Sequence, residues 1–339
     1  MILNVNELKE KLNILSRAYS QKTAQPALQF VKFDNDTLTV SNGKATIVTN
    51  YNSNIQALIP FKQLNDIVNK LNGKDLDLSL ADNQVIIKCN RSRFTLNLGE
   101  FNEYPSYNIL DDTNGLKVNC NEFINVISSI NYATSNNEKR PILTGINFSE
   151  FTVATDSFRL ARINKDLGLR CTIARDDIDN LISILKNSEE VLISNNKNVA
   201  AFKFGDTIYQ TRLLDGNYPD TSRLIAEGYQ YSIKVDRERL IESIERVNIF
   251  NEEYAIIILD ANDGVLKLSS NATQVGDATD LLECECNDNI KFACNGDYLK
   301  ETLSKFKGDT ITLNLVSNMK PITIKEDDMV ALVLPVKVE

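Results

Sequence analysis

The sequence predicts an α+β fold of three tandem domains, each with two helices packed on antiparallel sheets. Two observations carry this prediction. One is an internal repeat whose period is close to a third of the chain, and the other is a regular alternation of helical and strand-like segments. The chain has 339 residues, of which 42% are hydrophobic and 24% charged, which is enough apolar material for several separate cores.

Two unrelated motifs repeat with nearly the same period. The segment QPALQFVKF at 25–33 corresponds to RPILTGINF at 140–148, and their prolines, Pro26 and Pro141, are 115 positions apart. A Tyr-Pro pair recurs in FNEYPSY and DGNYPDT, with Tyr104 and Tyr218 separated by 114 positions. A third of 339 residues is 113, so the repeat predicts three domains. We expect their bounds at 1–114, 115–229 and 230–339.

Amphipathic stripes predict six short helices, two in each third of the chain. Leu8, Leu12 and Leu15 are spaced to share one helical face. A stripe that begins at Phe61 has Pro60 before it and Gly73 after it, which are typical start and stop signals. The predicted helices begin near residues 7, 61, 121, 176, 236 and 296.

The segments between these helices alternate apolar and polar residues, as half-buried antiparallel strands do. Examples are 37–40, 94–98 and 265–268, and Asn42-Gly43 and Asp263-Gly264 are typical hairpin turns. A sheet covered by helices on one face leaves open edges, which can pair with another chain. A head-to-tail contact that closes after a whole number of subunits removes such edges by forming a ring.

Composition excludes several kinds of active site. The chain has no histidine, so it cannot hold a Ser-His-Asp or Cys-His nucleophile or a His-containing zinc site. The Cys284-x-Cys286 pair indicates either a metal or redox pair or two small sheet residues in a reducing compartment, and we prefer the second interpretation. The acidic pairs at 176–177 and 327–328 fall at a helix start and in a turn, where carboxylates are favoured structurally. We therefore predict no enzyme activity, no cofactor and no metal.

Location and charge give two further expectations. The first residues lack the basic and apolar regions of a secretory signal, and no segment approaches the roughly 18 apolar residues of a membrane span. We expect a cytoplasmic protein without a membrane partner. The net charge of −9 argues against tight binding to nucleic acid through a basic face.

Five motifs give the chain a family resemblance. They are NRSRF at 90–94, RPILTGINF at 140–148, ATDSFRLA at 154–161, LLDGNYPD at 213–220 and LVLPVKVE at 332–339. With them, the chain resembles the beta sliding clamp of bacterial DNA polymerase III over its whole length. The resemblance implies three clamp domains and a ring-shaped homodimer that encircles duplex DNA without sequence specificity. It also implies a processivity factor in DNA replication, whose partners are the replicative DNA polymerase, a clamp loader and other peptide-motif proteins.

The resemblance further implies a peptide pocket between the second and third domains. Its residues would be Leu143, Thr155, Ser157, Phe158, Arg159, Leu160, Pro219, Arg223, Leu224, Tyr254, Asn295, Tyr298, Val333, Leu334, Pro335, Val336 and Lys337. Apolar walls would bury the anchors of an extended peptide, while Arg159 and Arg223 would offer donors. The chain departs from the family where Gly-His is replaced by Ser157-Phe158 and where methionines are replaced by Leu334 and Val336. We expect a stiffer and more apolar pocket. The alternative for Arg159 is a surface arginine paired with Asp156.

Two other sets of residues follow from the resemblance. The subunit contact would place Arg91, Arg93 and Phe94 opposite Ile249, Asp280 and Glu283. Lys22 and Arg140 precede the two matching prolines and would face DNA. A ring holds DNA by topology, so a few phosphate contacts suffice and the acidic net charge is no obstacle.

Two other functional hypotheses compete with the closed ring. One is an enzyme, which the absence of any phosphate loop or nucleophile motif disfavours. The other is a clamp-fold peptide-binding adaptor that never closes on DNA, and the mass in solution separates it from a dimeric ring.

Overall fold

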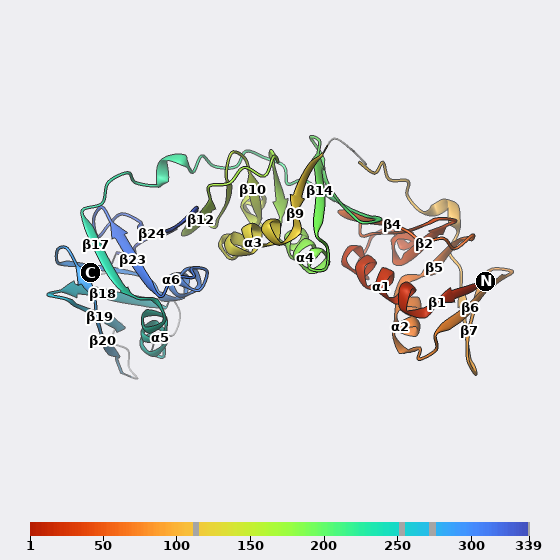
Figure 1. Ribbon diagram of the computed structural model, residues 1–339, viewed down its shortest axis with the longest axis horizontal. Coiled ribbons are helices and arrows are strands. Elements are labelled where there is room, and N and C mark those ends of the chain that lie inside the picture. Colours follow the sequence, from red (N-terminus) through yellow and green to blue (C-terminus); the bar gives the residue numbers. More distant parts are fainter. Residues whose placement is uncertain (111–114, 251–254, 271–275, 338–339) are drawn as a thin grey trace. The chain divides into compact units, whose positions relative to one another are not determined.

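The computed structural model describes residues 1–110, 115–250, 255–270 and 276–337 (Figure 1). These residues form two compact units. Unit 1 comprises Met1–Ile124 and Asp176–Leu213, and unit 2 comprises Asn125–Arg175 and Leu214–Glu339. Each unit therefore combines one outer third of the chain with part of the middle third. The domain bounds expected from the repeat stay a prediction, because the compact units follow sheet pairing and not the repeat.

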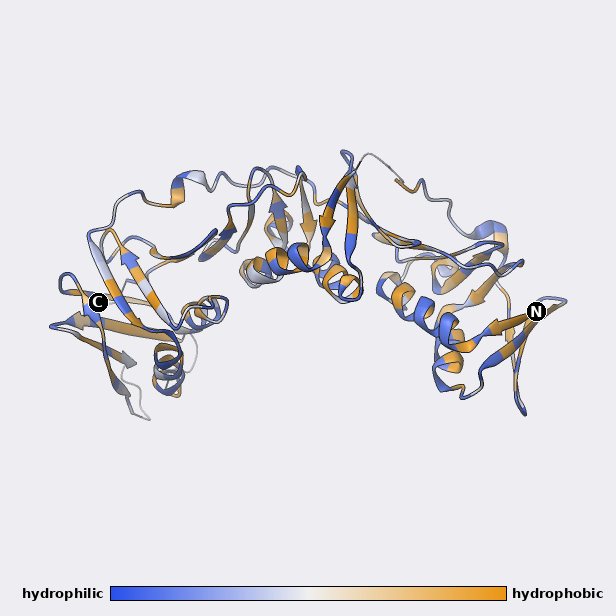
Figure 2. Ribbon diagram, viewed as in Figure 1, coloured by the Kyte–Doolittle hydropathy of each residue, from blue (hydrophilic) through white to orange (hydrophobic). Residues whose placement is uncertain are grey.

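Six α-helices occur in the described residues, two in each third, as the stripes predict. Their bounds are α1 Val5–Leu15, α2 Phe61–Lys70, α3 Cys120–Ile130, α4 Arg175–Leu185, α5 Arg237–Asn248 and α6 Gly296–Leu303. The α1 leucines Leu8, Leu12 and Leu15 are fully buried. Asn4 caps α1 and Asp236 caps α5 by accepting a backbone N–H of the first turn. Hydrophobic and hydrophilic residues alternate along each helix (Figure 2), which leaves one face to pack on a sheet.

Unit 1 contains two antiparallel sheets. The smaller has the order β1-β6-β7-β8 and the larger β5-β2-β3-β4-β16-β15-β14-β9. The strands of the smaller sheet are β1 Ile2–Asn4, β6 Asp75–Ala81, β7 Gln84–Cys89 and β8 Ser92–Asn97. Those of the larger are β2 Phe30–Asp34, β3 Thr37–Ser41, β4 Ala45–Asn50, β5 Gln56–Pro60, β9 Leu116–Asn119, β14 Glu190–Asn195, β15 Val199–Phe204 and β16 Thr207–Arg212. Pairing of β4 with β16 joins strands of the first and second thirds of the chain.

Unit 2 also contains two antiparallel sheets, with the orders β13-β10-β11-β12-β25-β24-β23-β17-β21 and β20-β19-β18-β22. The strands of the first are β10 Gly145–Phe148, β11 Thr152–Thr155, β12 Arg159–Ile163, β13 Cys171–Ala174, β17 Tyr231–Asp236, β21 Glu285–Cys286, β23 Thr310–Leu315, β24 Ile322–Glu326 and β25 Met329–Val333. Those of the second are β18 Ile256–Asn262, β19 Val265–Ser270, β20 Thr279–Glu283 and β22 Ile290–Asn295. Pairing of β12 with β25 joins the second and last thirds.

The two repeat motifs adopt the same local structure. The Pro26 motif forms the 3-10 helix η2 Pro26–Gln29 and the Pro141 motif forms η5 Pro141–Thr144, each with proline at its start. In each, the backbone N–H two residues after the proline donates to the carbonyl before it, at 3.0 Å. The remaining 3-10 helices are η1 Ser16–Ala18, η3 Phe101–Glu103, η4 Asn131–Ala133 and η6 Ser222–Leu224.

The repeated Tyr-Pro motifs also have matching roles. Tyr104 packs in unit 1 against Leu28 and Leu58. Tyr218 packs in unit 2 against the cluster of Val153, Leu160 and Leu332. Each tyrosine therefore packs its own Tyr-Pro segment, near the end of the first or second third of the chain, against a hydrophobic cluster.

Unit 1 holds one buried carboxyl that the sequence did not single out as buried. Asp177, in the first turn of α4, is 8% exposed, and the Tyr209 hydroxyl of β16 donates to its Oδ1 at 2.5 Å. Burial raises the pKa of the Asp177 carboxyl, and hydrogen bonds from Tyr209 and Thr211 only partly oppose that rise. The hydrogen bond between Tyr209 and Asp177 therefore joins α4 to β16, the strand that pairs with β4.

Candidate functional site

Two motifs from distant parts of the chain meet through strand pairing in unit 2. β12, from the ATDSFRLA motif, pairs antiparallel with β25, from the C-terminal LVLPVKVE motif. Arg159 lies opposite Val333, and Leu160 lies opposite Leu332. The two segments to which the resemblance assigned one pocket are therefore neighbours in one sheet.

The residues after β25 are held on both sides. The Leu334 N–H donates to the Phe158 carbonyl at 2.9 Å, and the Val336 N–H donates to the Ala293 carbonyl at 2.8 Å. Pro335 forms a bridge with Cys294 of β22. The segment 333–337 thus crosses from the start of β12 to the outer strand of the smaller sheet, and Leu334 is 40% exposed on the way.

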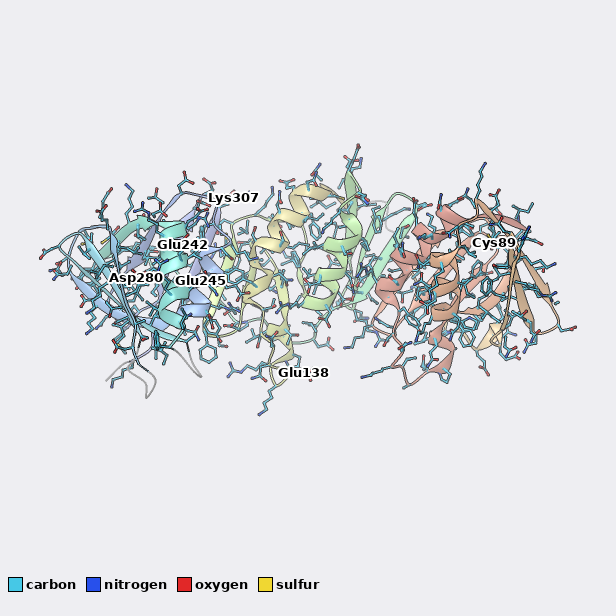
Figure 3. The ribbon with its side chains drawn as sticks, turned by 90° about the horizontal axis from the view of Figure 1, so that it is seen from below. Cys89, Glu138, Glu242, Glu245, Asp280 and Lys307 are labelled. Carbon is cyan, nitrogen blue, oxygen red and sulfur yellow. The ribbon has the colours of Figure 1, made fainter. Side chains whose placement is uncertain are left out.

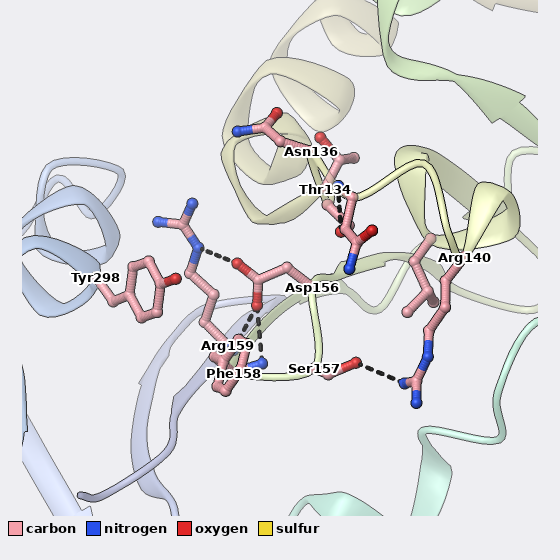
Figure 4. A pocket seen from close by; sticks show the side chains of 11 residues that line it. Thr134, Asn136, Arg140, Asp156, Ser157, Phe158, Arg159 and Tyr298 are labelled. Carbon is pink, nitrogen blue, oxygen red and sulfur yellow. Dashed lines mark hydrogen bonds and ion pairs between the residues drawn. The ribbon is translucent and has the colours of Figure 1, made fainter. Parts of the chain in front are cut away.

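A pocket of about 660 Å³ opens beside this crossing (Figure 4). One wall is polar and comes from the segment after η4, while the other comes from the turn before β12 and from α6. Its lining residues are Thr134, Ser135, Asn136, Asn137, Arg140, Leu143, Asp156, Ser157, Phe158, Arg159 and Tyr298. An opening of this size suits a few side chains of an extended peptide.

Asp156 shapes the turn between β11 and β12. Its Oδ1 accepts the backbone N–H groups of Phe158 and Arg159 at 2.8 and 2.9 Å. The Thr155 hydroxyl donates to the Arg159 carbonyl at 2.6 Å, which closes the turn from the other side. Ser157, at the tip, has φ of +80°, a conformation that favours glycine. The position at which the resemblance implies glycine is therefore occupied by a strained serine in this chain.

Arg159 connects the turn before β12 to α6 and keeps only a small part of its surface exposed at the opening. Its side chain is 9% exposed, with Nε 3.0 Å from Asp156 Oδ2 and Nη1 2.5 Å from Glu301 Oε2. The guanidinium lies over the rings of Tyr298 and Tyr132, at 4.5 and 5.2 Å from their centroids. Burial lowers the Arg159 pKa, but the two carboxylates outweigh it and raise the pKa above its ordinary value. Arg159 thus has the Asp156 partner of the alternative interpretation and a second partner in Glu301, while Tyr298 of α6 and Tyr132 of η4 cover much of its side chain.

An aromatic pair forms the wall next to Arg159. The ring of Phe158, 58% exposed, stacks with that of Tyr298 at a centroid distance of 6.3 Å. Tyr298 is fixed at the start of α6, where Asn295 caps the helix by accepting the Tyr298 N–H at 3.0 Å. Asn295, assigned to the pocket by the resemblance, therefore positions Tyr298 and does not itself line the opening.

The connecting segment after β16 lies against the outer part of this region. Tyr218 and Ile225 pack on the cluster that contains Leu160. Pro219, Arg223 and Leu224 lie between them in the chain and are exposed. Leu160 is only 2% exposed, so it supports the floor of this region more than it offers surface.

The predicted pocket residues thus divide by location. Leu143, Ser157, Phe158, Arg159 and Tyr298 line one opening, whereas Val336 and Lys337 line a second one beside it. Thr155, Leu160 and Val333 are buried beneath, and Tyr254 lies outside the described residues. The polar wall at 134–137 was missed, although its run of Thr-Ser-Asn-Asn after a helix was a visible signal. Arg140, predicted to face DNA, lines the first opening and donates to Ser157 Oγ at 3.4 Å.

The residues predicted for the subunit contact lie on or beside outermost strands. Arg93 and Phe94 belong to β8, which ends the smaller sheet of unit 1, and Arg91 is exposed in the turn before it. Asp280 and Glu283 belong to β20, which ends the smaller sheet of unit 2, and Ile249 follows α5 with 75% of its surface exposed.

Asp280 already has a partner within its own chain. Nη2 of Arg246, in α5, lies 2.7 Å from Asp280 Oδ2, and Nη1 lies 3.6 Å from Glu242 Oε2. Figure 3 labels Asp280 and Glu242 beside α5. Burial raises the pKa of Asp280, but hydrogen bonds from Arg246 and Ser243 hold it below its ordinary value. Glu283, at the end of β20, is exposed.

The described residues contain neither a metal-binding cluster nor a membrane-spanning helix. Within the described ranges, no group of three or more Cys, Asp or Glu side chains is arranged to hold a metal ion. Cys284 lies between β20 and β21, Cys286 ends β21, and both are free thiols. In the part of the chain that the structure describes, no helix has the length and apolarity to cross a membrane.

The chain is similar to known proteins over nearly its whole length. Sequence models of the N-terminal, central and C-terminal domains of the DNA polymerase III beta subunit match residues 3–108, 117–220 and 222–337. A beta sliding clamp of Staphylococcus aureus is 28% identical over 364 aligned positions, covering 96% of each chain. The chain belongs to the DNA polymerase III beta subunit family. Its function is that of a DNA sliding clamp, a processivity factor in DNA replication.

Solved structures show the same fold. The DNA polymerase III beta chain of Streptococcus pneumoniae is 25% identical, with a TM-score of 0.92 and 99% of each chain covered. The DNA polymerase sliding clamp of Bacillus subtilis is 23% identical, with a TM-score of 0.92 over 100% of this chain and 99% of that one. The predicted fold class of three α+β clamp domains is confirmed.

Proposed function

We propose that two copies of this chain close head to tail into a ring around duplex DNA and tether the replicative polymerase through the pocket in unit 2. The ring would slide on DNA without reading sequence and would carry out no chemistry, so it needs no cofactor. A closed ring must be opened to receive DNA, which is the task of a clamp loader. The protein would work in the cytoplasm, where chromosomal DNA is replicated in bacteria.

The observation that carries the ring is the pair of outermost strands, β8 and β20. They belong to different units, so one copy can offer β8 while the other offers β20 in a heterologous contact. Unpaired outer strands present rows of N–H and C=O groups that favour pairing with another chain. Leu281 on β20 is 62% exposed and Ile249 75% exposed, which is unfavourable unless another surface covers them.

Charge supports the same pairing of strands. Arg91 and Arg93 are exposed at the start of β8, and Glu283 is exposed at the end of β20. In an antiparallel pairing, the start of one strand meets the end of the other, so arginines meet a carboxylate. Asp280, which is bound by Arg246, would instead shape the surface of its own subunit.

DNA would be retained mechanically and not by affinity. Lys22 and Arg140 occupy equivalent loops before the two repeated 3-10 helices, and both are exposed. Such residues supply sequence-independent phosphate contacts. The net charge of −9 would limit binding to nucleic acid outside the ring.

Partner tails would bind along the crossing segment 333–337. Exposed apolar groups there are Phe158, Leu334 and Leu224, at 58%, 40% and 52% exposure. Arg223 is exposed and can donate to a peptide, whereas Arg159 is held by Asp156 and Glu301. Arg159 would therefore keep the pocket in shape while Arg223 and the apolar groups contact the partner.

Mass in solution tests the dimer. The double change Phe94→Asp and Ile249→Asp should produce folded monomer, because burying each of these side chains contributes roughly 1.5–3 kcal/mol and a carboxylate reverses that gain. Leu224→Asp is the control, since it changes an apolar residue of similar exposure outside the contact, and it should stay dimeric. A dimer from the double variant in light scattering would place the interface elsewhere. A monomeric wild-type protein would favour the adaptor that never closes on DNA.

A further inference from the structure

A second opening lies where the crossing segment 333–337 reaches β22. It has a volume of about 370 Å³ and lies between β18, β22, the turn before β24 and the end of the described chain. Its lining residues are Ile258, Lys291, Phe292, Ala293, Asn318, Met319, Val336 and Lys337. Val336, whose N–H donates to the Ala293 carbonyl, lines this opening, and two residues earlier the Leu334 N–H donates to Phe158, which lines the first opening.

The second opening has an apolar floor and a basic rim. Phe292 is almost fully buried, whereas Met319 is 57% exposed and can adapt to what lies on it. Lys291 and Lys337 are both exposed, and within the described residues neither has a carboxylate within ion-pair distance. The pair of lysines therefore keeps its capacity to bind an anion.

The neighbouring charges leave the rim basic. Asp260 of β18 is the cross-strand neighbour of Lys291, and Lys267 of β19 is the neighbour of Asp260 on its other side. This row thus holds two lysines and one aspartate, and Lys337 adds another positive charge beside it. An acidic group that enters the opening would meet net positive charge over an apolar base.

We propose that this second opening is a subsite for acidic residues that flank the apolar anchor of a partner peptide. The inference rests on the proposed docking of partner peptides beside Phe158 and Leu334, and it assigns a chemical preference to them. Continuity supports it, because Leu334 and Val336 are two residues apart, about 7 Å in an extended chain. A peptide anchored at Leu334 therefore needs only one or two further residues to place a carboxylate between Lys291 and Lys337.

Two synthetic peptides test this subsite. Both peptides carry the apolar C-terminal anchor of the replicative polymerase and a fluorescent label. One peptide has two aspartates on each side of the anchor, and the other has two asparagines at the same positions. Two exposed ion pairs should make the aspartate peptide bind about threefold to tenfold more tightly in fluorescence anisotropy. Salt at about 0.5 M should remove most of this difference, because screening weakens exposed ion pairs.

Charge reversal locates the effect. Lys291→Glu should abolish the preference for the aspartate peptide while leaving the affinity for the asparagine peptide within about twofold, and Lys337→Glu should act in the same direction. Lys74→Glu is the matched control, the same charge reversal at an exposed lysine of unit 1 outside the opening, and it should keep the preference.

The remaining outcomes separate the acidic subsite from the peptide pocket. Equal affinities of the two peptides for the wild-type protein, or a preference that survives both reversals, would reject the acidic subsite and leave the peptide pocket standing. Failure of both peptides to bind the wild-type protein would reject the peptide pocket as well.

Discussion

The backbone N–H of Leu334 donates a 2.9 Å hydrogen bond to the carbonyl of Phe158, which joins the last described residues of the chain to the turn before β12. Both side chains are exposed next to this bond, at 40% and 58%. They therefore offer a partner one continuous apolar surface from two distant parts of the sequence. Because the bond is made by the backbone, Leu334 can be changed without breaking it.

Leu334→Ala should weaken the binding of a polymerase C-terminal peptide by about tenfold to a hundredfold, since losing one large aliphatic contact costs on the order of 1–3 kcal/mol. Leu80→Ala, which removes an equally exposed leucine from unit 1, should leave the affinity unchanged. Anisotropy with mass measured in parallel checks both. Unchanged affinity in Leu334→Ala, with the dimer intact, would place the partner site elsewhere.

Leu160→Ala should also weaken the peptide, but through a different cause. Leu160 is 2% exposed and packs with Val153 and Leu332, so the change opens a cavity and costs about 2–5 kcal/mol of stability. Thermal unfolding separates the two effects. A Leu160→Ala protein as stable as the wild type would contradict the packing described for this cluster.

Ser157→Gly should stabilise the chain by about 0.5–1 kcal/mol. A serine at φ of +80° carries strain of about 1–3 kcal/mol, which exceeds the entropy that glycine adds to the unfolded chain. Ser157→Ala, which removes the hydroxyl and keeps the strained Cβ, should show no gain. Urea unfolding of the three proteins measures the difference, and a glycine variant less stable than the alanine variant would mean that the turn is not strained.

Asp177 should make stability fall as pH rises. Its folded pKa is raised above the ordinary 3.8, so the folded state binds the proton more tightly than the unfolded state, and ionisation above that pH destabilises the fold. Asp177→Asn keeps an acceptor for the Tyr209 hydroxyl without a charge, and it should raise the melting temperature at neutral pH but not below pH 3.8.

Asp177→Ala is the contrast to the asparagine variant. It leaves the buried Tyr209 hydroxyl without its acceptor, which should cost about 1–3 kcal/mol at any pH. Melting curves from acid to neutral pH give both results. An asparagine variant that is less stable than wild type at neutral pH would show that the ionised carboxylate is the favoured form.

Local patterns were sufficient to predict the helices and hairpins. All six helix starts lie within two residues of the observed ones, because apolar stripes such as Leu8, Leu12 and Leu15 leave one face to bury. Turns such as Asp263-Gly264 adopt the positive φ that their residues favour. These features depend on residues that are close together in the sequence, so one sequence is enough to predict them.

The site needed contacts that sequence spacing does not encode. Glu301, the strongest partner of Arg159, comes from α6, and no local pattern pairs it with the turn at 156–159. The polar wall at 134–137 joins the pocket only because η4 returns to the same place. The resemblance identified which motifs meet, whereas burial decided their roles, as with Leu160 in the floor and Phe158 on the surface.

Retention on DNA tests the closed ring most directly. The wild-type protein, loaded onto a nicked circular duplex by its clamp loader, should stay bound through a high-salt wash and should be released when the circle is linearised, since the link is mechanical. A protein held by phosphate contacts behaves differently, because salt strips it from circular and linear DNA alike. Salt-resistant retention on the circle with loss on linearisation is the result predicted for a sliding clamp. Loss from the circle at high salt after loading would contradict the ring.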